Sequence, residues 1–155
     1  MTEQAQRVFQ IQRIYVKDLS FESPGAPEVF SGKWSPTANM QLNNSARRIG
    51  EGNDYEVEVA VTLTAEQEGK TIYLVEIKQA GIFTISGAGE QELEQLLGAY
   101  CPSILFPYLR EVVASTINHG SFPAFQLQPI NFDALFQQAK AKRAEQVEQA
   151  DQTAH

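Results

Sequence analysis

Residues 55 to 64 alternate between apolar and mostly polar side chains, and this alternation constrains the fold more than any other feature of the chain. A period of two is typical of a β-strand that buries one face and hydrates the other. The apolar positions are Tyr55, Val57, Val59, Val61 and Leu63, and the intervening positions are Glu56, Glu58, Ala60, Thr62 and Thr64. The segment therefore predicts a sheet with one buried face.

Further strands are predicted to join this one through local, antiparallel connections. Residues 8 to 22 form a long strand, with Ile14 and Val16 interrupting an odd-numbered apolar set of Phe9, Ile11, Tyr15, Leu19 and Phe21. Residues 37 to 43 form a short strand before a loop at 44 to 53, with one face made by Ala38, Met40 and Leu42. A hairpin loop at 66 to 70 leads to a strand with one face made by Tyr73, Val75, Ile77, Phe83 and Ile85.

The stretch from residue 98 to 110, GAYCPSILFPYLR, combines a dense apolar run with two prolines. It continues a helical stripe of Leu93, Leu96, Leu97 and Tyr100. Because proline is disfavoured inside a helix, Pro102 and Pro107 predict a helix that ends or kinks near Cys101 and restarts by Tyr108. So large an apolar run is either the hydrophobic centre of one domain or an interface between subunits.

A last helix is expected after Asn131, which can cap its first turn. Its anchors are Phe132, Leu135, Phe136 and Ala139. From Lys140 onward the chain is rich in alanine, glutamine and charge, which predicts a fraying helix and a mobile tail. We therefore expect one domain over residues 1–155, with an ordered core of about 8–140 and a mobile tail at 141–155. Strands followed by helices predict an α+β fold.

The composition points away from nucleic acid and from membranes. A formal net charge of −7 opposes binding to phosphate and is compatible with a basic or extended polypeptide partner. The first residues are polar, and no run of 18 apolar residues occurs, so we expect a cytoplasmic protein that does not insert into a membrane. The single Cys101 excludes an internal disulfide and is expected to be a buried apolar residue.

The sequence gives little support to an enzyme. Gly87-Ala88-Gly89 lies between a strand and a helix, the setting of a dinucleotide-binding turn, but Glu92 occupies the third glycine position. Glu90 and Glu92 would also repel a pyrophosphate. His119 and His155 are the only histidines, and no acidic spacing completes a metal site around them. We expect no catalytic residue, cofactor or metal, although a small enzyme remains an alternative.

Two groups of residues have the character of binding surfaces. Acidic side chains recur at the polar strand positions beside Leu74, and they form either a hydrated sheet face or a docking patch: Asp18, Glu22, Glu56, Glu58 and Glu76. Phe30 and Trp34 lie in a loop at 23 to 36 that is rich in proline and glycine. Together with Phe132 and Phe136 they form either an aromatic groove or ordinary cover of the core.

Four stretches of the chain resemble the SecB protein-export chaperone family. They run in order as FQIQRIYVKDLSFE at 9–22, AGIFTISG at 80–87, GAYCPSILFPYLRE at 98–111 and INFDALF at 130–136. The resemblance implies a four-stranded antiparallel sheet with helices packed on one face. It also implies an ATP-independent chaperone that binds unfolded preproteins and delivers them to the SecA ATPase. An acidic interaction subunit without a client groove is the alternative.

The resemblance also implies roles for individual residues. It places the SecA-binding patch on Asp18, Glu22, Leu74 and Glu76, and it makes Phe30, Trp34, Phe132 and Phe136 candidates for a client groove. The family forms a tetramer, a dimer of dimers, and interface candidates here are Val75, Ile77, Gln79 and Tyr100. We expect a homotetramer because this strand face and the 98–110 stretch carry more apolar surface than a small monomer easily hides. The family's C-terminal contact with SecA has no matching pattern in the tail.

Overall fold

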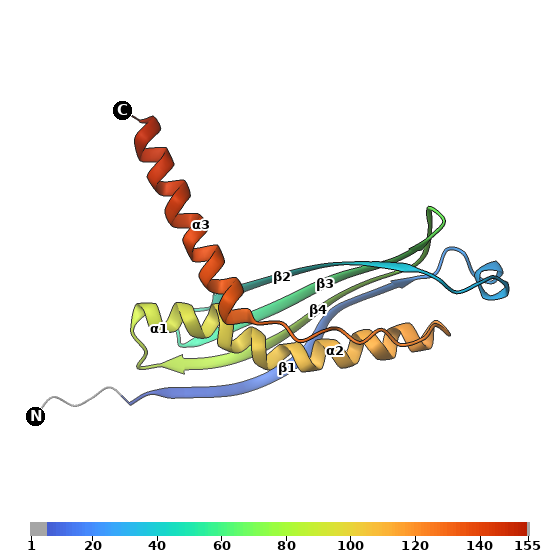
Figure 1. Cartoon of the computed structure of the whole chain (residues 1–155). Coiled ribbons are helices and arrows are strands. Elements are labelled where there is room, and N and C mark those ends of the chain that lie inside the picture. Colours follow the sequence, from blue (N-terminus) through green and yellow to red (C-terminus); the bar gives the residue numbers. More distant parts are fainter. Residues whose placement is uncertain (1–5, 155) are drawn as a thin grey trace, which may run out of the picture.

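The computed structural model describes residues 6–154, which form a four-stranded sheet followed by helices (Figure 1). The strands are β1 (Val8–Glu22), β2 (Thr37–Ile49), β3 (Asp54–Gln67) and β4 (Lys70–Ser86). The helices are α1 (Glu90–Gln95), α2 (Cys101–His119) and α3 (Phe132–Thr153), with a 3₁₀ turn η1 (Glu28–Ser31) and a π-helical turn η2 (Leu96–Tyr100). The expected α+β class with a four-stranded antiparallel sheet is confirmed.

The strands follow the order β1–β4–β3–β2, and every neighbouring pair is antiparallel. β1 and β2 are therefore the two edges, and the loop of residues 23–36 crosses from one edge to the other. β3 and β4 form a hairpin whose turn residues, Glu68 and Gly69, have φ values of 54° and 75°. Such a turn suits the twist of paired strands, and it lies within the hairpin loop expected at 66 to 70.

Two register shifts in β1 decide which of its residues face the helices. Gly81 marks the helical side, because a β-carbon there would meet the side chain of Leu105 in α2. Ile14 pairs with Gly81 and so faces α2, whereas Tyr15 pairs with the next residue and points to the open face. The shifts, between residues 11 and 13 and between 16 and 18, each change the alternation by one position. The odd-numbered apolar face predicted for β1 is therefore wrong at Tyr15.

β2 is longer than its side chains indicate. It continues to Ile49 in unbroken register with β3, so residues 44–49 are strand where a loop was expected. The polar side chains of this half are exposed on an edge strand, and its pairing depends on backbone hydrogen bonds that no apolar pattern reveals. Gly50, with φ of 65°, begins the turn that leads to β3.

The helical layer is continuous from Glu90 to His119 through α1, η2 and α2 (Figure 1). The break and restart predicted around Cys101 and Tyr108 are therefore wrong. Pro107 lies inside α2 on its exposed side, where water can reach the carbonyl of Ser103 that loses its usual donor. The irregularity falls in η2, which ends at Tyr100 directly before α2 begins and two residues before Pro102.

The hydrophobic core lies between α2 and the helical face of β3 and β4. Its largest fully buried side chains include Val59, Val61, Leu63, Ile77, Phe83, Leu105, Leu109, Val113 and Ile117. Cys101 is also buried, as expected. The 98–110 stretch therefore supplies the centre of a single chain on one side, while Tyr100 and Tyr108 remain about half exposed on the other.

α3 begins at the predicted cap and then leaves the body of the molecule (Figure 1). The Oδ1 of Asn131 accepts a hydrogen bond from the backbone N–H of Ala134 at 3.0 Å. The helix continues to Thr153, and its residues from 137 onward are exposed. The tail expected at 141–155 is thus helical as far as Thr153, and its mobility stays a prediction. Within residues 6–154 no helix is long and apolar enough to cross a membrane.

Candidate functional site

The four residues expected to form an acidic patch lie together on the open face of the sheet. Glu22 is directly opposite Leu74 in the pairing of β1 with β4, and Glu76 is opposite Ser20 two residues further along. Asp18 follows on the same face. The three carboxylates are exposed and Leu74 is half-buried. We call these four residues the acidic patch.

The surroundings of the acidic patch are largely uncharged. On the neighbouring strand β3, Thr64 and Thr62 lie opposite Leu74 and Glu76. Lys78, which is paired with Asp18, is the basic residue at the border of the patch. The patch therefore presents a row of three negative charges with one apolar side chain at its end, a combination that favours a basic partner with some apolar surface.

Glu56 and Glu58 form a separate network on the same open face. The carboxylate of Glu56 lies 2.9 Å from Lys17 Nζ and 3.1 Å from Arg47 Nε, and it also accepts a hydrogen bond from the Tyr15 hydroxyl. Lys17 Nζ is 3.4 Å from Glu58 as well. These contacts, with Lys17 and then Tyr15 foremost, hold the pKa of Glu56 at about 2. Glu56 is only 7% exposed and its charge is paired with Lys17 and Arg47, so it does not extend the acidic patch.

Sequence reasoning assigned no role to Lys17 or Arg47. Lys17 lies in the second register shift of β1, and this bulge turns its side chain toward Glu56. Arg47 is directly opposite Glu56 in the part of β2 that was expected to be a loop. Both roles depend on strand register, which the alternation of side chains did not reveal.

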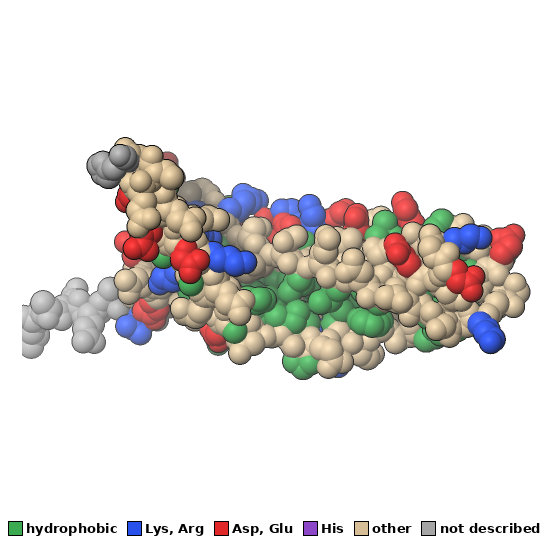
Figure 2. Space-filling view, turned by 45° about the horizontal axis from the view of Figure 1, so that its top comes forward, with side chains coloured by type: hydrophobic (Ala, Val, Ile, Leu, Met, Phe, Trp, Pro, Cys, Tyr) green, Lys and Arg blue, Asp and Glu red, His purple; other side chains and the backbone are tan. Residues whose placement is uncertain are grey.

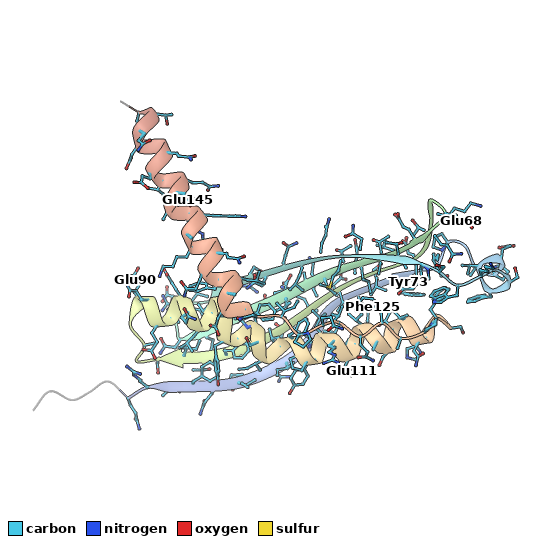
Figure 3. The ribbon with its side chains drawn as sticks, viewed as in Figure 1. Glu68, Tyr73, Glu90, Glu111, Phe125 and Glu145 are labelled. Atoms are coloured by element: carbon cyan, nitrogen blue, oxygen red, sulfur yellow. The ribbon has the colours of Figure 1, made fainter. Side chains whose placement is uncertain are left out.

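Phe30 and Trp34 stack on Phe122, which lies three residues beyond the end of α2. The ring centroids of Phe30 and Phe122 are 5.4 Å apart, and those of Trp34 and Phe122 are 5.5 Å apart. Tyr73 of β4, labelled in Figure 3, packs against Phe122 from the side of the sheet, with ring centroids 5.1 Å apart. Phe122 is buried, yet Phe30 is 52% exposed and Trp34 is 42% exposed. We call these four residues the aromatic cluster, and two of them present apolar rings to solvent.

Phe132 and Phe136 lie elsewhere, at the start of α3. Phe132 is buried against Phe106, with ring centroids 5.7 Å apart, so it belongs to the core rather than to an open groove. Phe136 is half-buried on Gly98 of η2, in the space that a β-carbon there would need. The structure therefore divides the four groove candidates into two pairs at different places along the molecule, and it brings Phe122 to the first pair.

Apolar surface continues between these two places. Figure 2 shows hydrophobic side chains gathered in a band along the middle of the molecule. The connector of residues 120–131 runs beside α2, and its half-buried Phe125 lies over the middle of the body (Figures 1 and 3). Met40, on the face of β2 that looks toward the helices, is also exposed. The loop end and the start of α3 are thus linked by partly exposed apolar residues.

The candidates for a tetramer interface are mostly covered within one chain. Val75, Ile77 and Gln79 face α2 and are at most 2% exposed. The expectation that this strand face supplies free apolar surface is therefore wrong. Gln79 donates a hydrogen bond to the backbone carbonyl of Tyr15 at 3.1 Å. Tyr100 is exposed and packs edge-on against Phe9, with ring centroids 5.2 Å apart.

The exposed apolar surface lies instead along the edge strand β1. Ile11, Val16 and Leu19 all fall on the helical side of this strand, and each is between 40% and 50% exposed. The edge position of β1 leaves these residues outside the full cover of α2. Sequence reasoning placed them in a strand but could not tell that the strand is an edge.

Reactive groups are sparse among the described residues. Across residues 6–154, no cluster of three or more histidine, cysteine, aspartate or glutamate side chains could hold a metal ion. Burial raises the pKa of the Cys101 thiol to about 12, so this sulfur stays protonated at neutral pH and is a poor nucleophile. His155 lies outside the described residues.

An open antiparallel sheet with one helical layer, an acidic patch on one face and exposed aromatic rings on the other defines an α+β binding protein. The family model described as "Preprotein translocase subunit SecB" matches residues 2–143. A protein-export protein SecB from Alcanivorax borkumensis is 63% identical over 142 residues, which cover 90% of each chain. Its counterpart from Alkalilimnicola ehrlichii is 52% identical over 143 residues, 92% of this chain and 76% of the relative. The chain belongs to the SecB family.

The fold also has a solved counterpart. A SecB-like chaperone from Mycobacterium tuberculosis, solved in complex with a peptide from an antitoxin, superposes with a TM-score of 0.65 and 18% identity. The match covers 79% of this chain and 90% of the mycobacterial one. At this level of identity the likeness concerns the fold.

Proposed function

We propose that this protein is an ATP-independent cytoplasmic chaperone that binds unfolded preproteins and delivers them to the SecA ATPase. Membership of a protein-export family supports the proposal. The observation that carries it is the separation of two exposed surfaces. Phe30 and Trp34 are exposed to solvent on the side of the sheet that carries the helices. Asp18, Glu22 and Glu76 are exposed on the opposite face of the sheet. Such a protein can hold a client and a second partner at once.

The client surface suits an extended, partly apolar polypeptide. Aromatic rings give large apolar contact area with few rotatable bonds, so they are efficient anchors for a chain that loses much conformational freedom on binding. The aromatic cluster is one anchor. The half-buried Phe125 and Phe136 and the band of hydrophobic side chains in Figure 2 offer further apolar contact. The mycobacterial chaperone with its bound peptide indicates that this fold can hold a polypeptide.

The acidic patch is proposed as the contact with SecA. An exposed ion pair contributes only about 0.2–1 kcal/mol, so one patch alone binds weakly. Several copies of the patch in one assembly can raise the apparent affinity by roughly 10²–10⁴ through avidity. Weak, salt-sensitive contacts also allow release after delivery.

A homotetramer, arranged as a dimer of dimers, would supply these copies. The support for assembly in this chain is the row of Ile11, Val16 and Leu19 on an edge strand, with Tyr100 and Tyr108 exposed on the helical layer. Exposed apolar surface rimmed by polar residues is typical of interfaces. Symmetric association is the usual way for identical chains to cover it.

The test is refolding of a denatured preprotein with the purified protein present and ATP absent. We expect refolding to slow in proportion to the chaperone added, and we expect Trp34→Ala to weaken the effect without lowering the melting temperature strongly. A control variant is Val147→Ala, which truncates an exposed apolar residue far along α3. Unchanged refolding at excess wild-type protein would contradict the proposal and favour an acidic interaction subunit without a client groove.

A further inference from the structure

The side-chain amide of Gln67 holds both peptide groups that flank Trp34. Its Nε2 donates a hydrogen bond to the backbone carbonyl of Lys33 at 2.7 Å. Its Oε1 accepts a hydrogen bond from the backbone N–H of Ser35 at 2.9 Å. The first group belongs to the peptide bond before Trp34, and the second belongs to the one after it. One amide therefore pairs with this segment as a neighbouring strand would.

This clamp connects a segment without secondary structure to a rigid base. Gln67 is the last residue of β3 and pairs with Lys70 across the two-residue turn of the hairpin. The other hydrogen bonds found within the loop join residues 23–31 to one another. Residues 32–35 are joined to other elements by two hydrogen bonds among residues 6–154, and Gln67 makes both of them.

Packing does not replace these bonds. A cavity of about 470 Å³ separates the loop from the hairpin, and its lining includes Val29, Gly32, Gln67 and Ile72. Figure 3 shows Glu68 at the tip of the hairpin, at the same end of the molecule as the loop. Gln67 reaches across the border of this cavity to the loop. The position of the Trp34 backbone therefore depends on the side-chain amide of Gln67 and on the stacking of the Trp34 indole on Phe122.

We propose that Gln67 is a positioning residue for client binding, and that its amide presents the Trp34 indole in the orientation that a client contacts. The inference rests on the proposed chaperone function. An indole that is held by its own backbone and stacked on one side only is ordered before a client arrives. A binding site ordered in advance loses less conformational freedom on association.

The expected effect of removing the clamp is weaker binding rather than unfolding. Gln67→Met keeps the length of the side chain and removes both hydrogen bonds. A client must then order the Trp34 segment as it binds, which corresponds to about threefold to tenfold weaker affinity. Gln67→Glu keeps an acceptor for Ser35 and loses the donor to Lys33, so its effect should be intermediate.

Trp34 is the only tryptophan of the chain, so its fluorescence reports the clamp directly. The experiment measures fluorescence anisotropy and acrylamide quenching of each variant, and then titrates each with a denatured client that contains no tryptophan. We expect Gln67→Met to lower the anisotropy, to increase quenching and to weaken client binding. The matched control is Gln41→Met, an exposed glutamine on the open face of β2, which should change none of these.

Three results would overturn the inference. Unchanged anisotropy in Gln67→Met would show that the clamp does not hold Trp34. A mobile Trp34 with unchanged client affinity would show that its position is irrelevant to binding. Failure of the wild-type protein to bind any client would remove the proposed function itself and the inference with it. Melting curves identify a variant that fails to fold, in which case Gln67→Glu supplies the comparison.

Discussion

The ammonium of Lys17 lies 2.9 Å from the carboxylate of Glu56, and this pair ties the second bulge of β1 to the centre of the open face. Arg47 reaches the same carboxylate from β2 at 3.1 Å. Glu56 on β3 is therefore connected to both edge strands of the sheet. The sequence pattern would place the Glu56 carboxylate on a hydrated face, whereas in the structure it is buried among these partners.

Glu56 should make stability depend on pH in the acid range. Its pKa is about 2 in the folded protein against an ordinary value of 4.5, so the unfolded chain binds the proton more readily. The stabilisation is present above pH 4.5 and is lost as the pH falls toward 2. We expect it to be on the order of 2 kcal/mol, reduced by the partial exposure of Lys17 and Arg47. Urea unfolding of the wild type at a series of pH values measures it.

Glu56→Gln is the variant that isolates this effect. It should lower the free energy of unfolding at pH 7, and its difference from the wild type should shrink as the pH falls below 4.5. Glu66→Gln, at an exposed position of β3, serves as the control and should follow the wild-type curve. If Glu56→Gln and the wild type lost stability in parallel, another carboxylate would be responsible.

Gly98 should be intolerant of any side chain, because a β-carbon there would overlap the ring of Phe136. Gly98→Ala forces the start of α3 away from η2, and overpacking of this kind costs about 1–3 kcal/mol. Hydrogen exchange of the amides near residue 136 should report the displacement. Gly89→Ala is the matched control, since nothing lies within 4 Å of its added carbon.

The double variant Gly98→Ala with Phe136→Ala tests whether the overlap is the cause. Phe136→Ala alone loses contact area, but it removes the ring that the new methyl group would meet. The two changes should therefore cost less together than the sum of their separate costs. Strict additivity would mean that Gly98 is needed for the geometry of the π-helical turn instead.

The sequence predicts the centre of the sheet well because β3 and β4 each have one buried face. The residues from Val57 to Leu63 alternate between buried and partly exposed, as the sequence pattern predicts. Glu22 and Leu74 lie on the polar side of their own strands, and their direct pairing places them on the same face of the sheet. β2 does not show such an alternation beyond Asn43, where this edge strand is held by backbone pairing and by the contact of Arg47 with Glu56 rather than by buried apolar side chains. Tyr15 fails because a bulge changes the count, and no local residue pattern announces a bulge.

The candidate site shows the same division between local and distant information. The sequence places Phe30 and Trp34 in a loop that must cover or present apolar surface, and the structure shows both rings half exposed. It could not indicate that Phe122, about ninety residues later in the chain, is their partner. Nor could it separate Phe132, a core residue, from Phe136. These relationships depend on how the connector returns along α2, which is a property of the whole fold.

Assembly should depend on the exposed face of β1. We expect the wild-type protein to be a homotetramer by light scattering at micromolar concentration. Leu19→Arg places a charge in the row of Ile11, Val16 and Leu19, and it should shift the protein to smaller species without unfolding it, because Leu19 is half exposed. Val147→Arg makes the same kind of change on α3 and should leave the mass unaltered. A stable wild-type monomer would contradict the proposed interface.

The acidic patch should be needed for SecA binding and not for clients. Glu76→Lys and Asp18→Lys replace attraction by repulsion toward a basic partner, so each should weaken SecA binding more than Glu76→Ala does. The loss should be greater at low salt, where exposed charges interact over longer distances. SecA titration at two ionic strengths measures both effects.

Two controls decide what such a loss means. Glu145→Lys reverses an exposed charge on α3, distant from the patch, and should leave SecA binding close to that of the wild type (Figure 3). Client binding should also survive Glu76→Lys, because the aromatic cluster is built on Tyr73, which points to the opposite face of β4. Equal loss of client and SecA binding would show that the patch supports the fold. If neither were lost, SecA would have to bind another surface of the molecule.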